Sequence, residues 1–298
     1  MCCGSGRAAT ETVSEMTNLH VPLLANQAAM AGCSFESAAY ASALPPTHLL
    51  QREPSKGLRW TNLLDTWLVC RLAQATPLRL VWLGFLGCSD LDRWRVILRL
   101  DGVEVFDSRT GGTDLLCADA ALALPSRKNR RHCFVLLPSA ITADEVEITV
   151  FVNGTPRHYE TGDALNYLDL GALVIAGDAT SFFQSQRSMS YGLNPPSLTD
   201  PSRAAVAAPG QRAPLNRSPY DVATWELNYL TEAEAVGDLR DFMERVGTTK
   251  PVLALLKPLA TQYSERWSIL GLLERIEPLT LRQFNIFRNV FSIEGFVP

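Results

Sequence analysis

Residues 94–106 read Trp-Arg-Val-Ile-Leu-Arg-Leu-Asp-Gly-Val-Glu-Val-Phe, and this stretch carries the clearest sign of the fold. Apolar and charged residues alternate through its first half, with Trp94, Val96, Leu98 and Leu100 set against Arg95 and Arg99. Because successive side chains of a strand point to opposite faces, this alternation predicts a strand with one buried face. The Asp101-Gly102 pair that follows favours a tight turn into a second strand over 103–106, so the stretch predicts an antiparallel hairpin.

The region around the hairpin, residues 60–152, is strand-like throughout. Further strands are expected at 67–72, 78–86, 132–137 and 146–152, and Asn153-Gly154 marks a turn after the last of them. The segment 78–86 is apolar at successive positions, which is typical of a strand covered on both faces. Six or more short strands without helices between them predict an antiparallel β-sandwich.

A strand that runs straight into a capped helix is predicted at 222–247. Thr231 and Glu234 have the spacing of a capping box, and Gly247 is a suitable residue to end the helix. Apolar residues alternate along the strand and repeat on one face of the helix. The expected core between strand and helix consists of Trp225, Leu227, Tyr229, Val236, Leu239 and Phe242. Further strands are expected at 251–257, 267–273 and 284–293, which predicts an α+β unit with one helix packed on a small sheet or barrel.

Composition divides the chain into four segments. We expect a flexible N-terminal arm at 1–18, a β-sandwich at 19–177, a Pro-rich connecting segment at 178–221 and the α+β domain at 222–298. An edge strand is expected at 19–23, because a proline within a strand has no N–H to give to a neighbour. Six prolines between 192 and 219 argue against regular structure there. A chain of 298 residues is long enough for two cores, and the predicted fold class is mainly β.

The overall charge argues against a general nucleic-acid binder. The formal net charge is −4 and the pI is near 5.7, whereas nucleic-acid-binding domains usually carry a basic face. The cations Arg127, Lys128, Arg130 and Arg131 form a local basic patch, which we interpret as a solvated turn rather than a phosphate site. The most apolar stretch, 78–88, is far shorter than the ~20 residues needed to cross a bilayer. We therefore expect neither membrane insertion nor sequence-specific binding of nucleic acid.

The seven cysteines follow no metal-binding spacing: they are Cys2, Cys3, Cys33, Cys70, Cys88, Cys117 and Cys133. No Cys-x-x-Cys pair occurs, so neither a zinc ribbon nor an iron–sulfur cluster is indicated. Cys70 and Cys88 lie in apolar strand-like runs, where a free cysteine behaves as a small hydrophobe. We interpret the cysteines as reduced thiols in a protein made in a cytoplasm.

Residues suited to catalysis are scattered along the chain. The four histidines fall in no metal-binding or catalytic motif: they are His20, His48, His132 and His158. Asp90 and Asp92 form the best local carboxylate pair for glycoside hydrolysis, but aspartate is common in loops and we expect both in a solvated loop. We predict no catalytic, cofactor-binding or metal-binding residue, and we do not expect an enzyme.

The tryptophans of the first domain differ in their predicted surroundings. Three fall within predicted strands, where core packing is expected: Trp67, Trp82 and Trp94. Trp60 is instead expected in a loop, flanked by Arg59 and Asn62. Because an exposed aromatic ring stacks on the apolar face of a sugar, Trp60, Arg59 and Asn62 are candidate carbohydrate contacts.

Several segments carry a resemblance to a known family. They are Pro-Pro-Thr-His-Leu-Leu at 45–50, Arg59-Trp60, and the stretches 67–72, 80–87 and 94–100. Together they resemble the galactose-binding-like jelly roll found in tail proteins of bacterial viruses. Residues 163–177 look like the exit strand of such proteins. The strand and helix at 222–247, followed by a strand containing Lys-Pro, are similar to distal-tail and baseplate proteins of long-tailed phages.

This resemblance implies a structural component of a phage virion. Such a protein would be made in the bacterial host cytoplasm and would reside at the tail tip. There it would form a six-fold or three-fold homo-oligomeric ring that connects the tail tube to other baseplate proteins or fibre proteins. The segment 192–219 and the N-terminal arm would cross between subunits. The alternative is a carbohydrate-binding or adhesion protein that uses the β-sandwich to recognise a host surface glycan.

Overall fold

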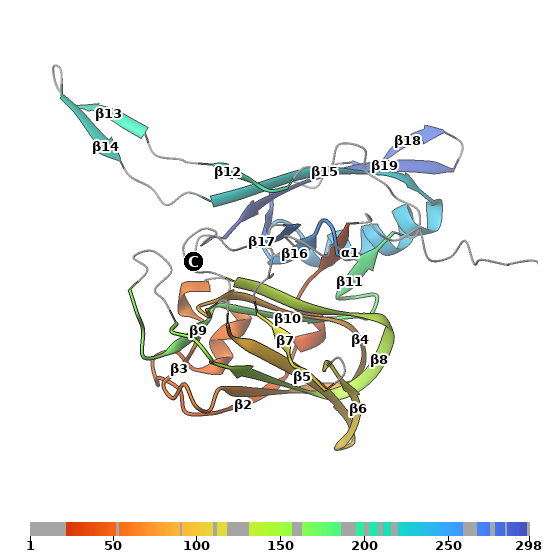
Figure 1. Cartoon of the computed structure of the whole chain (residues 1–298). Helices are drawn as coiled ribbons and strands as arrows, with labels where there is room; N and C mark the ends of the chain where they lie inside the picture. Colours follow the sequence, from red (N-terminus) through yellow and green to blue (C-terminus); the bar gives the residue numbers. More distant parts are fainter. Residues whose placement is uncertain are drawn as a thin grey trace, which may run out of the picture.

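The computed structural model describes residues 22–51, 54–89, 91–109, 112–117, 131–156, 163–185, 195–199, 203–207, 211–215, 220–258, 267–274, 278–283 and 285–296. The predicted arm at 1–18, Asp90, His20, His158 and the basic residues 127–130 lie outside these ranges. The chain is mainly β, and within these ranges its strands pair antiparallel in one seven-stranded, one eight-stranded and two two-stranded sheets. Figure 1 shows the seven-stranded sheet below and the eight-stranded sheet with its helix above.

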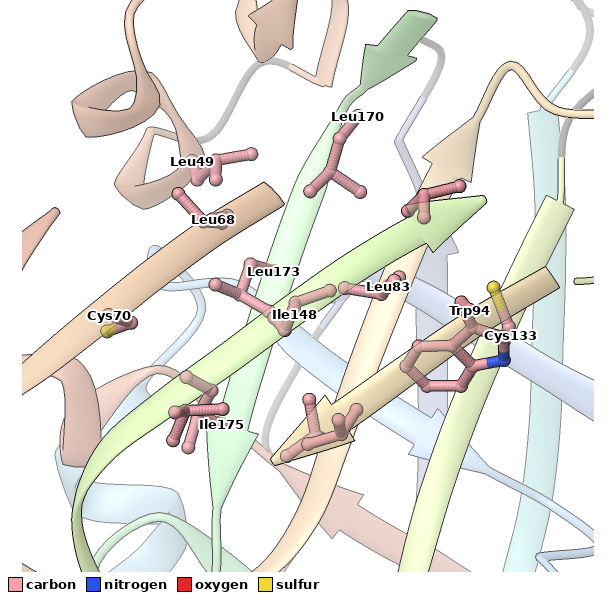
Figure 2. Packing of buried hydrophobic residues seen from close by; sticks show 14 of the residues in the cluster. Leu49, Leu68, Cys70, Leu83, Trp94, Cys133, Ile148, Leu170, Leu173 and Ile175 are labelled. Atoms are coloured by element: carbon pink, nitrogen blue, oxygen red, sulfur yellow. The ribbon is translucent and has the colours of Figure 1, made fainter. Parts of the chain in front are cut away.

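The seven-stranded sheet folds on itself to make the sandwich. Its order is β10-β4-β8-β5-β6, with β2 added beside β4 and β7 beside β5. The strands are β2 (Ser34–Ser37), β4 (Trp67–Leu86), β5 (Arg93–Leu100), β6 (Val103–Asp107), β7 (Leu115–Leu116), β8 (Arg131–Phe151) and β10 (Ala172–Ala176). Side chains from both halves of the folded sheet meet in one core, where Figure 2 shows Leu68, Ile148 and Leu173 pointing toward one another.

Two long strands produce this folding. The segments predicted as separate strands at 67–72 and 78–86 form one strand, β4, of 20 residues, and those at 132–137 and 146–152 form one strand, β8, of 21 residues. The pairing of β4 with β8 shifts register between Arg71 and Thr76 and again between Leu78 and Leu80. Such irregularities bend strands, so each long strand crosses from one layer of the sandwich to the other without a break in the chain.

The predicted hairpin at 94–106 is confirmed. Strands β5 and β6 pair antiparallel, and the turn residues Asp101 and Gly102 have φ of 52° and 78°. Positive φ at both central positions is what a type I′ hairpin turn requires. The inward residues Trp94, Val96 and Leu98 are at most 1% exposed, as the alternation predicted. Leu100, predicted on the same face, is only partly buried, and Ile97 on the other face is also buried.

The second half of β4 is covered on both faces, as its sequence predicted. Leu80 and Trp82 point away from the sandwich core and are fully buried against the eight-stranded sheet. The contact is largely apolar, and one hydrogen bond crosses it, between His132 Nδ1 and Ser268 Oγ at 2.9 Å. Its buried apolar residues come from both sheets: Leu80, Trp82, Ala172, Val174 and Ala176 with Leu23, Ala25, Leu253, Leu255 and Leu270. The two sheets are therefore packed through a second core of their own.

The eight-stranded sheet has the order β11-β1-β16-β17-β19-β15-β12, and β18 pairs with β19. Its strands are β1 (Leu23–Ala25), β11 (Phe182–Gln184), β12 (Ser197–Thr199), β15 (Tyr220–Leu230), β16 (Val252–Leu255), β17 (Ser268–Leu273), β18 (Thr280–Gln283) and β19 (Ile286–Gly295). The edge strand predicted at 19–23 lies mostly outside the described residues, and the first described strand, β1, begins at Leu23. It lies between β11 and β16, because its apolar residues are needed on both faces of this sheet. The domain boundaries themselves stay a prediction.

The predicted helix follows β15 directly, as η4 (Ala233–Leu239) with π-helical geometry and α1 (Arg240–Val246). The capping box forms: the backbone N–H of Thr231 donates to the Glu234 carboxylate at 2.9 Å, and the N–H of Glu234 donates to Thr231 Oγ1 at 3.3 Å. Gly247 ends the helix with φ of 59°. Four of the predicted core residues are buried between sheet and helix: Trp225, Leu227, Leu239 and Phe242.

Two predicted core residues are exposed instead. Tyr229 is 52% exposed and has φ of 67°, because a bulge between Leu227 and Leu230 interrupts the alternation and brings Leu230 to the core. Val236 is 43% exposed, because it lies one residue from the stripe that buries Ala235 and Leu239.

The Pro-rich segment contains more regular structure than expected. Besides β12, its described parts form β13 (Arg203–Ala207) and β14 (Gln211–Leu215), which pair with each other. Figure 1 shows this hairpin projecting away from both large sheets. The remaining elements are β3 (Leu58–Trp60), β9 (Leu168–Leu170) and the short helices η1 (Ala28–Met30), η2 (Pro46–Leu50) and η3 (Pro54–Lys56). Within the described ranges, no helix has the length and apolar character that crossing a bilayer requires.

Candidate functional site

Loops gather at one end of the sandwich, which we call the loop end. Here β4 ends at Leu86 opposite the first residue of β8, and β5 begins at Arg93 opposite Phe151, the last residue of β8. The short strands β3 and β9 pair with each other at this end. The backbone N–H of Gly87 donates to the carbonyl of Asp169 at 2.9 Å, which fixes β9 to the end of β4.

Trp60 lies in the core and not in an exposed loop as predicted. It is the last residue of β3 and is 0% exposed. Its indole N–H donates to Ser37 Oγ at 3.0 Å and to the carbonyl of Trp67 at 3.1 Å, so its polar atom is satisfied inside the protein. The expected stacking of Trp60 on a sugar is therefore wrong for this conformation.

Arg59, the neighbour of Trp60, points to the other face of β3 and reaches the surface. It lies opposite Asp169 in the β3–β9 pairing. Its Nε and Nη2 donate to the two carboxylate oxygens of Asp169 at 2.7 and 2.9 Å, and its guanidinium carbon lies 3.8 Å from the centroid of the Tyr167 ring. We call Arg59, Tyr167 and Asp169 the Arg59 surface.

The Arg59 surface is charged, ordered and still open to solvent. The side chains of Arg59 and Asp169 are 32% and 37% exposed. The hydrogen bonds that Arg59 donates to Asp169 raise the pKa of Arg59, so its guanidinium stays protonated. Two of the five N–H donors of the guanidinium bind Asp169, so the planar pair is fixed while part of its hydrogen-bonding edge faces outward.

Two further residues border this surface. Tyr40 is 43% exposed and pairs through its backbone with Trp60. Asn62 is exposed as predicted, but its side-chain oxygen accepts the N–H of Leu64 at 3.1 Å and so shapes the turn after β3. Leu64, at the tip of that turn, is 97% exposed. The candidate contacts thus divide into a buried Trp60, a surface Arg59 and a turn-forming Asn62.

Asp92 is a buried anchor of the loop end, which corrects its predicted place in a solvated loop. It is 0% exposed and accepts four hydrogen bonds of 2.8–2.9 Å. Two come from the N–H and hydroxyl of Ser89, and two from the N–H groups of Asn153 and Gly154. A carboxylate whose oxygens are filled in this way holds two loops together and presents no open face for acid–base chemistry.

A group of thiols lies beside this anchor. Cys88, Cys117 and Cys133 come from three segments, are each at most 6% exposed, and are free thiols. Hydrogen bonds to Cys133 and Cys88 and burial raise the pKa of Cys117. The interpretation of Cys70 and Cys88 as small buried hydrophobes is confirmed. Among the residues that the structure describes, no group of three or more His, Cys, Asp or Glu is disposed to hold a metal ion.

The outer face of the sandwich carries a network of ion pairs. Arg71 bridges Glu36 and Glu145, and Arg99 bridges Glu145 and Glu147. A separate pair on β5 and β6 repeats the geometry at Arg59: the Nε and Nη2 of Arg95 donate to the two oxygens of Asp107 at 3.0 and 2.6 Å. These pairs were not foreseen from the sequence, although the outward arginines of β5 were.

The helix side of the molecule has a separate surface hollow of about 740 Å³. It is lined by Thr231, Glu232, Ala233, Val236, Gly237 and Asn285. Its lining is mostly apolar and includes Val236, the residue that was expected in the core. The charged and aromatic groups suited to fix a polar ligand lie at the loop end instead.

Comparison with known proteins gives no family. No family model matches the chain, and no curated protein matches it. Several solved structures align with about half of it. The CBM32-1 module of a family 31 glycoside hydrolase from Clostridium perfringens covers 48% of this chain and 93% of its own, with 15% identity and a TM-score of 0.34.

Two other alignments are of the same kind. A lectin-binding domain of lectinolysin, complexed with Lewis b, covers 52% of this chain and 99% of its own, with 14% identity and a TM-score of 0.35. The family 32 module of NanJ from Clostridium perfringens, in complex with galactose, covers 51% and 98%, with 13% identity and a TM-score of 0.34. The fold class stated above rests on the strand pairing of this chain, and these likenesses add no argument about its function.

Proposed function

We propose that this chain is a carbohydrate-binding protein whose Arg59 surface contacts the sugar. The observation that carries the proposal is the bidentate Arg59–Asp169 pair with Tyr167 stacked against it, a third exposed at the loop end. Sugar hydroxyl groups both donate and accept hydrogen bonds, so a fixed guanidinium–carboxylate pair offers them both kinds of partner. The aromatic ring adds an apolar surface for the C–H groups of a sugar ring.

The rigidity of this surface favours binding over a purely structural role. The Arg59–Asp169 pair also links β3 to β9. An ion pair with only this structural role would not need to leave part of its guanidinium edge exposed to solvent. The buried Trp60 beneath Arg59 and the Asp92 anchor beside it hold the surrounding loops in place. A surface that is already ordered loses less conformational entropy when it binds.

The experiment is a glycan array probed with the labelled full chain, followed by calorimetry on the strongest glycan. Arg59→Met and Tyr167→Leu are expected to lower the affinity at least about tenfold, since each removes one kind of contact. Arg95→Met is the matched control, because it breaks a bidentate Arg–Asp pair of the same geometry that includes no residue of the Arg59 surface. Circular dichroism and thermal melting show whether each variant is folded.

The proposal has a clear contrary result. If the wild-type chain binds no glycan, or if Arg59→Met and Arg95→Met bind equally well, the Arg59 surface is not a sugar site. The solved structures that align with this chain include a CBM32 module and a family 32 module in complex with galactose. The proposal stands on the residues of this chain and not on those alignments.

A second candidate function is the structural role in a phage tail tip, with a three-fold or six-fold ring. The observation that favours it is the β13–β14 hairpin, which projects from the body as an assembly arm would. Light scattering and negative-stain micrographs of the purified chain, alone and with tail-tube protein, test this role. Closed rings support it, and a monomer that ignores tube protein counts against it.

A further inference from the structure

The β13–β14 hairpin has an unusual position in the fold. The two strands form a two-stranded sheet, and among the described residues neither strand pairs with anything else. Figure 1 shows the hairpin reaching outward, away from the sandwich and from the eight-stranded sheet. The hairpin extends the antiparallel β12–β15 ladder outward, since Thr199 pairs with Tyr220 and Arg203 with Leu215. A two-stranded ribbon without further strands is at best marginally stable in water. Pairing with another strand would supply the stability that the hairpin lacks.

The two outer edges of the hairpin are not equivalent. Residues 203–207 pair with 215–211 in an unbroken ladder in which Pro214 lies opposite Ala204. Proline has no N–H and is tolerated in a strand where its nitrogen faces away from the partner. Position 214 therefore faces the outer edge of β14, where it interrupts the row of donors. A proline on an edge protects that edge from pairing.

The outer edge of β13 has no such protection. Its sequence is Arg-Ala-Ala-Val-Ala, without proline. Backbone groups of alternate residues face opposite edges, so Ala204, the partner of Pro214, presents its N–H and C=O outward, and so does Val206. The hairpin thus has one blocked edge and one open edge.

We propose that the open edge of β13 pairs antiparallel with the β13 edge of a second copy of this chain, across a two-fold axis. Each strand then supplies the donors and acceptors that the other lacks, and a four-stranded sheet β14-β13-β13-β14 results. The pairing places Ala205 opposite Ala205 and Arg203 opposite Ala207.

Charge selects the antiparallel arrangement of the two copies. In antiparallel pairing, the two Arg203 residues lie at opposite ends of the ladder, about 14 Å apart along the strands. That separation exceeds the Debye length of about 8 Å at physiological salt, so their repulsion is screened. Parallel pairing in register would set the two arginines side by side. This inference is independent of sugar binding, and a two-fold contact differs from the head-to-tail contacts of a ring.

Sedimentation velocity of the full chain over a hundredfold concentration range tests the proposal. A dimer is expected. Ala204→Pro removes an outward N–H from β13 and is expected to weaken the dimer at least about tenfold. Arg212→Pro is the matched control: position 212 lies opposite Val206, so it removes an outward N–H from the edge of β14 that is already blocked. It is expected to leave the dimer intact.

A cross-link reports the register directly. Ala205→Cys, oxidised with a small-molecule disulfide, is expected to form an intermolecular disulfide between the two positions 205, identified by mass spectrometry of the linked peptides. Ala207→Cys, which faces position 203 of the other copy, is expected to cross-link to itself much less. This measurement holds even if Ala204→Pro disturbs the hairpin.

Three outcomes would overturn the inference. They are a monomer at every concentration, a dimer or larger ring that Ala204→Pro and Arg212→Pro affect equally, and a 205–205 cross-link no stronger than that at 207. A ring that Ala204→Pro and Arg212→Pro affect equally would mean that another surface mediates assembly. None of these results would bear on sugar binding by the Arg59 surface.

Discussion

The carboxylate of Asp92 accepts the backbone N–H groups of Asn153 and Gly154, each at 2.8 Å, although these residues follow it by 61 and 62 positions. The contact ties the loop between β4 and β5 to the loop after β8. Both loops border the β3–β9 pair that carries Arg59. Order at the proposed sugar site therefore depends on a residue that never reaches the surface.

Asp92→Ala is expected to lower the free energy of unfolding by about 3 kcal/mol, because it leaves buried N–H groups without an acceptor. Urea unfolding at neutral pH measures the change. Asp65→Ala, at an exposed aspartate in another loop, is the control and should change stability by less than about 0.5 kcal/mol. Equal effects of the two substitutions would contradict the anchoring role.

Gly154→Ala is expected to destabilise the same loop, since an added Cβ would lie 2.0 Å from Ser89 Oγ and 2.7 Å from Ser89 Cβ. The expected loss is about 1–3 kcal/mol. Ser89→Gly removes both atoms, so the double variant should lose less than the sum of the two single variants. A double-mutant cycle in urea measures this coupling, and strict additivity would show that the two residues do not meet.

Asp107 is expected to make stability depend on acid pH. The hydrogen bond from Arg95 lowers the pKa of Asp107 in the folded protein. A lowered pKa means that its contribution is complete above the unfolded value of about 3.9 and is lost as the pH falls below that value. The free energy of unfolding, measured from about pH 5 to about pH 2, should therefore decrease less steeply with falling pH in Asp107→Asn than in the wild type.

The control for this titration is Asp65→Asn. Its free energy of unfolding should change with pH as that of the wild type does over the same pH range. Asp65 is exposed and shares neither arginine partner of Asp107. Parallel curves for Asp107→Asn as well would refute the contribution of the Arg95 pair.

The buried thiols are expected to react slowly in the folded protein. Contact with Cys133 and Cys88, and burial, raise the pKa of Cys117, and a thiol with a raised pKa holds little thiolate near neutral pH. Among the cysteines that the structure describes, Cys33 is partly exposed and should be alkylated first. Iodoacetamide labelling with peptide mass spectrometry, in buffer and in urea, measures the order. Labelling of Cys117 as fast as Cys33 in buffer would contradict the burial of this group.

Thr231→Ala is expected to cost about 1 kcal/mol, because the hydroxyl accepts the N–H of Glu234 at the start of the helix. Thermal or urea unfolding measures the loss. Thr231→Ser keeps the acceptor and should stay close to the wild type. If serine and alanine behave alike, the hydroxyl does not act as a cap.

The features that the sequence predicted correctly depend on residues close together in the chain. The hairpin at Asp101-Gly102 and the capping box of Thr231 with Glu234 each need only a few consecutive residues. The burial of both faces of the second half of β4 followed from its largely apolar composition, which only Arg79 interrupts with a charge. In each case, local chemistry and the final packing favour the same conformation.

The features that were missed depend on distant partners. The pairing of β3 with β9 decides which face of β3 is directed inward. As a result, Trp60 is buried and Arg59 reaches the surface. Tyr229 was misplaced because a bulge opposite β19 breaks a pattern that looks regular in the strand alone. The cluster of three thiols, Cys88, Cys117 and Cys133, is formed by three segments, and the spacing of these cysteines in the sequence resembles no motif. No reading of single segments could supply these pairings.

The position of β1 has a consequence for the way the protein is made. Leu23–Ala25 is synthesised more than two hundred residues before its partner β16. The sandwich has all its strands once β10 is complete, so it can close while this early strand still waits. Until then an apolar segment and the outer face of Trp82 stay uncovered, and the nascent chain is most exposed to aggregation, or to capture by a chaperone, during that interval.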